Sequence, residues 1–228
     1  MKRKIVVWGD SLLKGVIYDE PSRRYRFLDH SCLEILGQSQ KEWSFTNLSQ
    51  FGQTSDRALT KMKEKLREDH DFDIAIIELG GNDCDFDWKQ IAENPKVDHA
   101  PKIPLSEFRR NLTEMVNEIR SYGIVPVITN LPPINAERYF KFLSANLNPD
   151  QILVWLQDVN NIYRTQEMYS LELNDLAREL NVPLINVRTE LLRERDYNDC
   201  LCSDGIHLNA QGHRRLSDLI IARQYSFK

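Results

Sequence analysis

Five short apolar segments recur along the chain, and longer segments with a different spacing of apolar residues separate most of them. The short segments are rich in β-branched residues, which favours strands; they lie at 4–8, 44–48, 74–79, 124–130 and 184–187. Strands that alternate with helices form parallel sheets covered on both faces. We therefore expect a single α/β domain over residues 1–228, a three-layer α/β/α sandwich with a mostly parallel five-stranded sheet.

The clearest helical pattern begins near Ser106, a predicted N-cap, and ends at Gly123. Its apolar residues fall on one stripe, as a helix packed on a sheet requires. Weaker patterns predict helices at 27–36 and 59–66. Two further helices are predicted, one that ends at Leu180 and one that follows His207.

Two stretches are longer than ordinary connections, residues 84–104 and 132–165. Long connections in a compact domain are often functional or carry structure of their own. The second stretch is too apolar for a solvated loop, so we expect short helices there. These insertions either pack near the mouth of a site or simply extend the core, and the sequence leaves both alternatives open.

Composition narrows the class of protein. Hydrophobic residues make up 41 % of the 228 residues and charged residues 28 %, as in a soluble protein with a core. A formal net charge of −4 gives no basic surface for nucleic acid. No segment approaches the ~20 apolar residues of a membrane span, and none resembles a secretion signal, so we expect a cytoplasmic protein. The pattern leaves the oligomeric state open.

Cofactors and metals find no support in the sequence. No glycine-rich dinucleotide motif and no Walker lysine occur. The cysteines at 32, 84, 200 and 202 are predicted to be free thiols, because Cys200 and Cys202 lack the usual zinc spacing to the nearby histidines. Asp83, Asp85 and Asp87 alternate like a calcium loop, but the required glycine and glutamate are absent. We expect neither a cofactor nor a metal.

Candidate chemistry lies near the two ends of the sequence. Ser11 follows the first predicted strand, and Asp204 comes three residues before His207. A serine hydroxyl is a poor nucleophile near neutral pH, so it needs an imidazole to accept its proton and a carboxylate to orient that imidazole. A local turn brings Asp204 to Nδ1 of His207 and leaves Nε2 facing Ser11. The histidines at 30, 70, 99 and 213 have no such partner, and we interpret them as structural or exposed.

Four sequence blocks occur in an order that resembles the SGNH (GDSL) hydrolase family. They are Gly-Asp-Ser at 9–11, a turn glycine at 52, Gly-Gly-Asn-Asp at 80–83 and Asp-Gly-Ile-His at 204–207. The resemblance implies a flavodoxin-like SGNH hydrolase fold. It also implies an oxyanion hole made by the backbone N–H groups of Ser11 and Gly52 and the side-chain amide of Asn82. The second block departs from the family pattern at Ser49 and Phe51, and Phe51 is expected to reshape the pocket.

These observations predict a serine esterase that cleaves carboxylic esters through an acyl-enzyme on Ser11, with Asp204 and His207 completing the triad. Short acyl or acetyl esters are favoured, and the small-molecule substrates implied by the resemblance include acylated sugars and lipids. The lipase elbow Gly-x-Ser-x-Gly is absent, which excludes a conventional α/β-hydrolase. Two alternatives are an acyltransferase that uses the same site and a binding module without catalysis. The presence of every triad and oxyanion residue favours an enzyme.

Overall fold

A central sheet of five parallel strands organises the computed structural model, which describes residues 2–222. The strand order is β4-β1-β5-β6-β7. The strands are β1 (Arg3–Gly9), β4 (Trp43–Asn47), β5 (Ile74–Glu78), β6 (Val125–Thr129) and β7 (Leu184–Ile185). The predicted three-layer α/β fold with a parallel sheet is confirmed, and no strand bound differs from the prediction by more than two residues.

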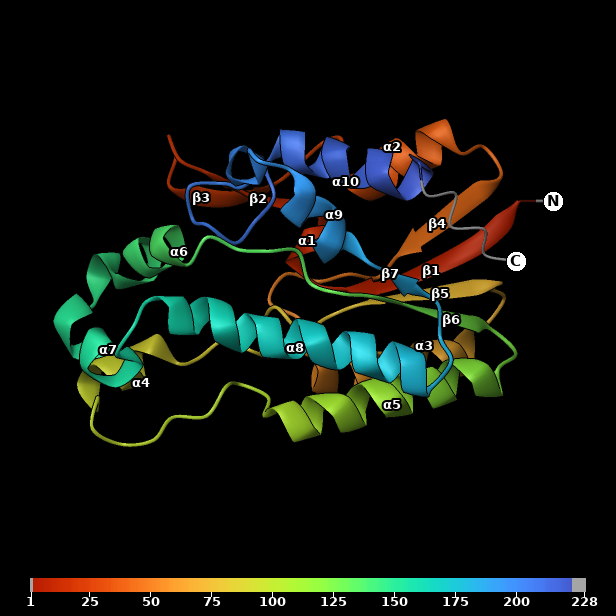
Figure 1. Ribbon diagram of the computed structural model, residues 1–228. Helices are drawn as coiled ribbons and strands as arrows, with labels where there is room; N and C mark the ends of the chain where they lie inside the picture. Colours follow the sequence, from red (N-terminus) through yellow and green to blue (C-terminus); the bar gives the residue numbers. More distant parts are fainter. Residues whose placement is uncertain (1, 223–228) are drawn as a thin grey trace.

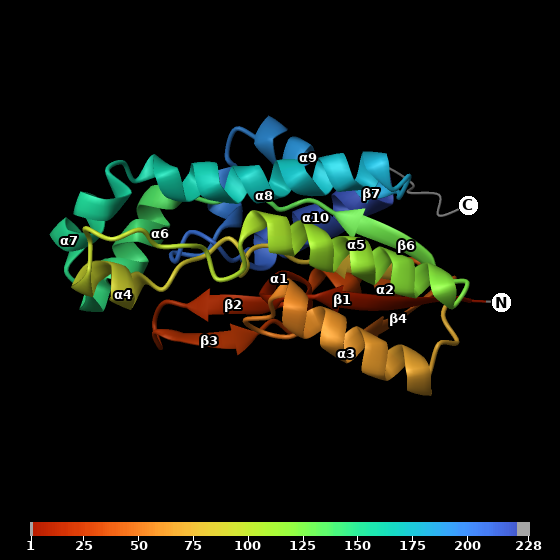
Figure 2. The ribbon, with the colours of Figure 1, turned by 90° about the horizontal axis from the view of Figure 1, so that it is seen from below.

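Helices cover both faces of the sheet (Figure 1). On one face lie α2 (Cys32–Ser39), α9 (Val187–Arg193) and α10 (Ala210–Ala222); on the other lie α3 (Ser55–Glu68), α5 (Leu105–Ser121) and α8 (Asn160–Glu179), which Figure 2 shows from their own side. The alternation along β1 produces this arrangement. Val6 and Trp8 pack in one apolar cluster, and Ile5 and Val7 pack in the other.

The predicted helix at 27–36 is wrong in its first half. Residues Val16–Asp19 (β2) and Arg24–Phe27 (β3) form an antiparallel hairpin instead, and Phe27 belongs to β3. The helix begins only at Cys32, because Ser31 and Glu34 form a capping box at its start. A smaller correction applies to α5, which starts after Pro104 and not at Ser106. At the last strand, Asn186 caps α9 by accepting from the N–H of Thr189.

The two long connections carry helices of their own. Residues 84–104 contain α4 (Trp88–Glu93), and residues 132–165 contain α6 (Ala136–Leu143), the 3₁₀ turn η1 (Ser144–Asn146), α7 (Pro149–Leu156) and the first turn of α8. Short helices in the second connection were predicted and are present. These segments pack into a third apolar cluster beyond the carboxyl ends of the strands, at the left of Figure 1. We call α4, α6 and α7 the cap.

Across residues 2–222, every helix is too short or too polar to pass through a lipid bilayer.

Candidate active site

Ser11 is the first residue of the short helix α1 (Ser11–Lys14), and only Asp10 separates this helix from β1. The carboxylate of Asp10 caps this helix by accepting from the N–H of Leu12 at 2.9 Å. The turn requires glycine at position 9, since a Cβ atom there would lie 2.8 Å from Ser49 Oγ and 2.9 Å from Glu78 Oε2. Gly9 therefore lets the chain end of β1 pass close to its neighbours and present Ser11 at the sheet edge.

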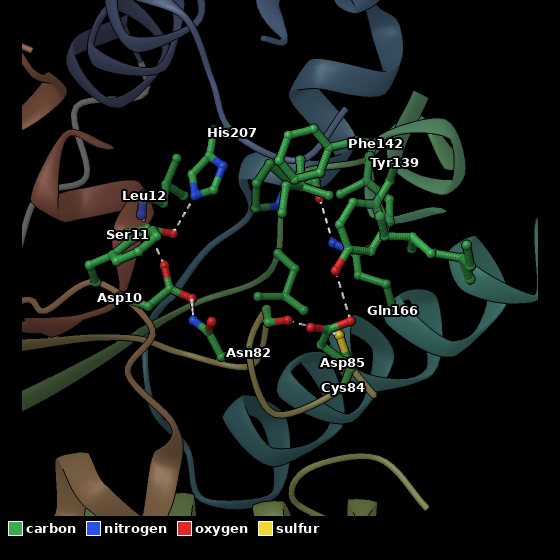
Figure 3. Close-up of a pocket in the computed structure, with 18 of the residues that line it drawn as sticks. Asp10, Ser11, Leu12, Asn82, Cys84, Asp85, Tyr139, Phe142, Gln166 and His207 are labelled. Atoms are coloured by element: carbon green, nitrogen blue, oxygen red, sulfur yellow. Dashed lines mark hydrogen bonds between the residues drawn. The ribbon is translucent and has the colours of Figure 1, made fainter. Parts of the chain in front are cut away.

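A continuous line of side chains runs from Ser11 to His207 to Asp204. The Ser11 hydroxyl lies 2.9 Å from His207 Nε2, as Figure 3 shows, and His207 Nδ1 lies 2.6 Å from Asp204 Oδ2. Asp204 is fully buried, and His207 is 6 % exposed. The carboxylate fixes the tautomer with hydrogen on Nδ1, which leaves Nε2 free to accept the serine proton.

The segment 201–208 forms a closed loop that contains both Asp204 and His207. Asp204 Oδ1 accepts from the N–H groups of Ile206 and His207, each at 3.2 Å. The N–H of Cys202 donates to the carbonyl of His207 at 2.8 Å, and Leu201 bridges to Leu208. Gly205 adopts φ +80° and presses against α6, where its carbonyl accepts from Asn135 N–H. The loop is thereby fixed both internally and against the cap.

The three residues predicted to form the oxyanion hole lie in three different segments, at the ends of β1, β4 and β5. Asn82 follows β5, and its amide nitrogen donates to Asp10 Oδ2 at 3.0 Å (Figure 3). Gly52 lies in the turn after β4 with φ +70°, a conformation that favours glycine. Within residues 2–222, the backbone N–H groups of Ser11 and Gly52 donate to no other group of the protein.

Asp83 connects two of these segments. It is fully buried, and its Oδ1 accepts from the N–H of Ser55 at 2.9 Å, at the start of α3. Burial raises the pKa of Asp83 to about 6, and the charge of Asp10 adds to this. Asn111 donates from α5 to Ser55 Oγ at 3.0 Å. The turn that contains Gly52 is thus tied to the segment that contains Asn82.

A cavity of about 260 Å³ opens beside Ser11 and extends beneath the cap. Its walls are mainly apolar and aromatic; they include Leu12, Phe86, Trp88, Leu131, Ile134, Leu143 and Ile162. The polar side chains in the deeper wall are engaged with one another. Asp85 accepts from Tyr139 at 2.9 Å and Trp88 at 2.8 Å, and Gln166 donates to the carbonyl of Pro132. The cavity consequently offers an apolar group mostly van der Waals contact.

Aromatic rings surround His207 at the mouth of this cavity. Tyr25 on β3 lies edge-on to the imidazole at 5.1 Å between ring centroids, and Phe51 lies at 6.2 Å. Phe142 on α6 packs against Tyr25 at 6.3 Å. Burial, then the charge of Asp204, raises the pKa of the Tyr25 phenol above its ordinary value. Phe51 is half exposed and lines the cavity, next to Gly52.

The structure brings to the site three residues to which the sequence analysis gave no role: Asp10, Glu78 and Tyr25. Asp10 lies within the Gly-Asp-Ser block, whereas no motif marks the other two. Tyr25 was assigned to no element, because the hairpin was not recognised. Glu78 had a signal, since a carboxylate at the end of an apolar strand is rarely buried without a partner. Among the remaining histidines, His213 is fully buried, and its Nδ1 accepts from Cys32 N–H at 3.3 Å.

No group of three or more metal-binding side chains converges within the described chain, and all four cysteines are free and buried.

The fold and the site define a class, an α/β/α protein with a serine, a histidine and a carboxylate at the carboxyl edge of its parallel sheet. The sequence profile of the GDSL-like Lipase/Acylhydrolase family matches residues 7–215. The chain therefore belongs to this family, and the membership indicates ester hydrolysis.

Individual relatives support the same family. The chain is 28 % identical to the isoamyl acetate-hydrolyzing esterase of Saccharomyces cerevisiae over 222 residues, which covers 96 % of this chain and 84 % of the yeast protein. A G-D-S-L lipolytic protein from Veillonella parvula superposes with a TM-score of 0.68 at 15 % identity, covering 99 % and 100 % of the two chains. A lipase/acylhydrolase from Enterococcus faecalis gives 0.64 at 18 % identity, with 97 % and 94 % covered.

Proposed function

We propose that the chain is a serine esterase that forms an acyl-enzyme on Ser11. Ser11 Oγ attacks the ester carbonyl carbon while its proton passes to His207 Nε2, and the tetrahedral intermediate collapses when His207 returns that proton to the departing alcohol. Water then attacks the acyl-enzyme by the same route and releases the acid. Asp204 keeps the imidazole oriented and stabilises its cation. No cofactor takes part.

The observation that carries this proposal is the short path Ser11–His207–Asp204, with distances of 2.9 and 2.6 Å, in which Asp204 is fully buried and His207 is 6 % exposed. The charge that develops on the carbonyl oxygen needs donors in place beforehand. The N–H groups of Ser11 and Gly52, which donate to nothing else in residues 2–222, and the amide of Asn82 supply three.

The walls of the cavity favour an ester with an uncharged, apolar part. No lysine or arginine lines it within the described chain, and its deeper polar groups already have partners. The yeast relative is named for isoamyl acetate, a short ester with a small branched apolar alcohol. We therefore propose short apolar esters as substrates, with the apolar part beneath the cap.

The test is hydrolysis of a 4-nitrophenyl ester series from acetate to octanoate by the wild type and by Ser11→Ala, with both proteins compared by circular dichroism. Removal of the nucleophile should lower kcat by at least about a thousandfold. Turnover near the wild-type level in Ser11→Ala would exclude Ser11 as the nucleophile. The chain length at which kcat/KM is greatest measures how far the cavity accepts an apolar chain.

A further inference from the structure

Beneath Ser11 lies a pair of buried carboxyl groups that the esterase mechanism does not use directly. Glu78 is the last residue of β5 and lies in register with Gly9 of β1. It is 2 % exposed, and its Oε2 accepts from the N–H of Asp10 at 3.2 Å. Asp10 is 4 % exposed. Two neighbouring buried carboxyl groups repel each other strongly when both are ionised, so one of the two is expected to stay protonated.

Asp10 has the partners of an anion. Its Oδ1 accepts from Leu12 N–H at 2.9 Å, and its Oδ2 accepts from Asn82 Nδ2 at 3.0 Å. The positive charge that forms on His207 also favours ionised Asp10. Burial opposes these effects and raises the pKa of Asp10. Each donor nevertheless stabilises the carboxylate form relative to the acid.

Glu78 has the surroundings of a neutral acid. Burial, then the charge of Asp10, raises the pKa of Glu78 well above its ordinary value. The other groups near the pair are Asp83, the thiol of Cys84, the hydroxyl of Ser49 from the turn after β4, and the backbone N–H of Leu13. Since no lysine or arginine lines the adjoining cavity in the described chain, nothing there balances a second negative charge.

The contact between Asp10 and Asn82 has a chemical consequence. A carboxylate can only accept, so it selects the amide orientation in which the nitrogen of Asn82 faces Asp10. One N–H of that nitrogen goes to Asp10, and the second remains for the carbonyl oxygen of a substrate. A protonated Asp10 would donate, and the amide could then turn its own oxygen toward the oxyanion, where it repels.

We propose that Glu78 is a positioning residue of the oxyanion hole. Glu78 stays protonated and donates a hydrogen bond through its O–H to the carboxylate of Asp10. Asp10 in turn holds the amide of Asn82 with an N–H toward the reacting carbonyl. The proposal rests on the esterase function above. Glu78 lines the cavity beside Ser11, but in this proposal it makes no bond to the reacting atoms. It acts by keeping Asp10 an anion at one defined place.

The experiment compares Glu78→Gln with Glu78→Met under saturating substrate. Glutamine retains a donor for Asp10 and an acceptor for its N–H, while methionine has similar length and neither group. Glu78→Met should lower kcat about tenfold to a hundredfold with KM changed less than about threefold, because positioning of one oxyanion donor is lost. Glu78→Gln should keep kcat within about threefold of the wild type, because the glutamine amide still donates to Asp10 and the oxyanion donor stays in place.

The pH profile adds a readout that a merely structural role would not move. Loss of the Glu78 proton at alkaline pH places two adjacent anions beneath the oxyanion, so wild-type kcat should fall on that side. Glutamine cannot lose a proton in this range, so the alkaline decrease should vanish in Glu78→Gln. Ser170→Ala, which alters another fully buried polar side chain on α8 away from the site, is the matched control and should leave the profile unchanged.

Two results would overturn the proposal. In the first, Glu78→Gln lowers kcat as much as Glu78→Met does. In the second, kcat of Glu78→Gln still falls at alkaline pH as it does in the wild type. Should Glu78→Met fail to fold, Glu78→Gln and its pH profile decide alone. Failure of the underlying function is recognisable separately, since wild type and Ser11→Ala would then hydrolyse the esters equally.

Discussion

The side-chain amide of Asn82 serves two acceptors in our interpretation, Asp10 in the resting protein and the carbonyl oxygen of a substrate during reaction. Only the first contact, at 3.0 Å, is present in the structure. The second follows from the mechanism, because the amide nitrogen has one hydrogen left. Mutation of this residue therefore separates a role in chemistry from a role in the turn after β5.

Asn82→Ala should lower kcat by roughly a hundredfold or more, with little change in KM, because an oxyanion donor acts mainly in the transition state. Steady-state kinetics on the best ester of the series measures this. Asn117→Ala, at an exposed position on α5, controls for the loss of an amide and should match the wild type. An unchanged kcat in Asn82→Ala would reduce Asn82 to a turn residue.

At the scale of single residues, the sequence predicted the catalytic candidates that belong to motifs. It did not predict the contacts that residues from different strands make with one another. Asp204 meets the His207 imidazole as predicted, because three residues separate them and a local turn joins them. Ser11, which lies 196 residues away, also reaches that imidazole, and this contact was expected from the order of the family motifs. Glu78 and Asp10 meet because Gly9 pairs with Glu78 across two strands, and 68 residues separate the two acids. Which residue of β5 faces Gly9 depends on the pairing of two strands far apart in the sequence, and the sequence analysis did not predict this pairing.

Among the elements, the loop 201–208 and helix α6 depend on a very close approach. A Cβ atom at Gly205 would lie 2.6 Å from the carbonyl oxygen of Asn135 and 2.7 Å from the nitrogen of Tyr139. Gly123, at the end of α5, also has positive φ, +74° against +80° at Gly205, but a Cβ atom there meets nothing within 4 Å. The two glycines thus share backbone strain and differ in steric clash.

Gly123→Ala should reduce the free energy of unfolding by about 1 kcal/mol, the strain of a left-handed alanine. Gly205→Ala should reduce it by more than about 3 kcal/mol, because backbone atoms must also move apart. Since the loop carries Asp204 and His207, only the second variant should lose ester hydrolysis as well. Urea unfolding and kinetics measure both effects; equal losses of stability would show that the contact with α6 is unimportant.

The elements themselves were predictable where one pattern ran without interruption. The apolar stripe of α5 and the apolar segment of β1 both form the predicted elements, because burial in the core agrees with local preference. The hairpin β2–β3 was missed because its strands have only four residues each and every residue of β3 is exposed. Its pairing of Tyr18 with Tyr25 depends on the fold around it, including Phe142 from α6.

For the whole molecule, the buried imidazole between α2 and α10 links stability to pH. Burial lowers the pKa of His213 to about 4 from 6.5, with a smaller contribution from His207. Below pH 6.5 the unfolded chain therefore binds a proton that the folded protein does not, and stability falls as the pH falls toward 4. Asp83, whose pKa is raised to about 6, acts in the opposite direction over nearly the same range.

The difference between two proteins isolates the histidine, since Asp83 is common to both. Relative to His213→Gln, the wild type should lose up to roughly 3 kcal/mol between pH 6.5 and 4. Denaturant unfolding at a series of pH values measures it, with His30→Gln at an exposed position as the control. Parallel stability curves for the wild type and His213→Gln would show that His213 accepts its proton normally in the folded protein.

The distance along the chain between Ser11 and His207, 196 residues, determines when the site can come into existence. A ribosome makes the nucleophile and all five strands of the sheet before it makes the imidazole. A folding intermediate with a formed sheet but an undocked 201–208 loop would hold Ser11 without a base. Contacts so far apart in sequence form late in folding. Esterase activity that returns during refolding therefore reports the final docking of this loop, later than any signal from the sheet.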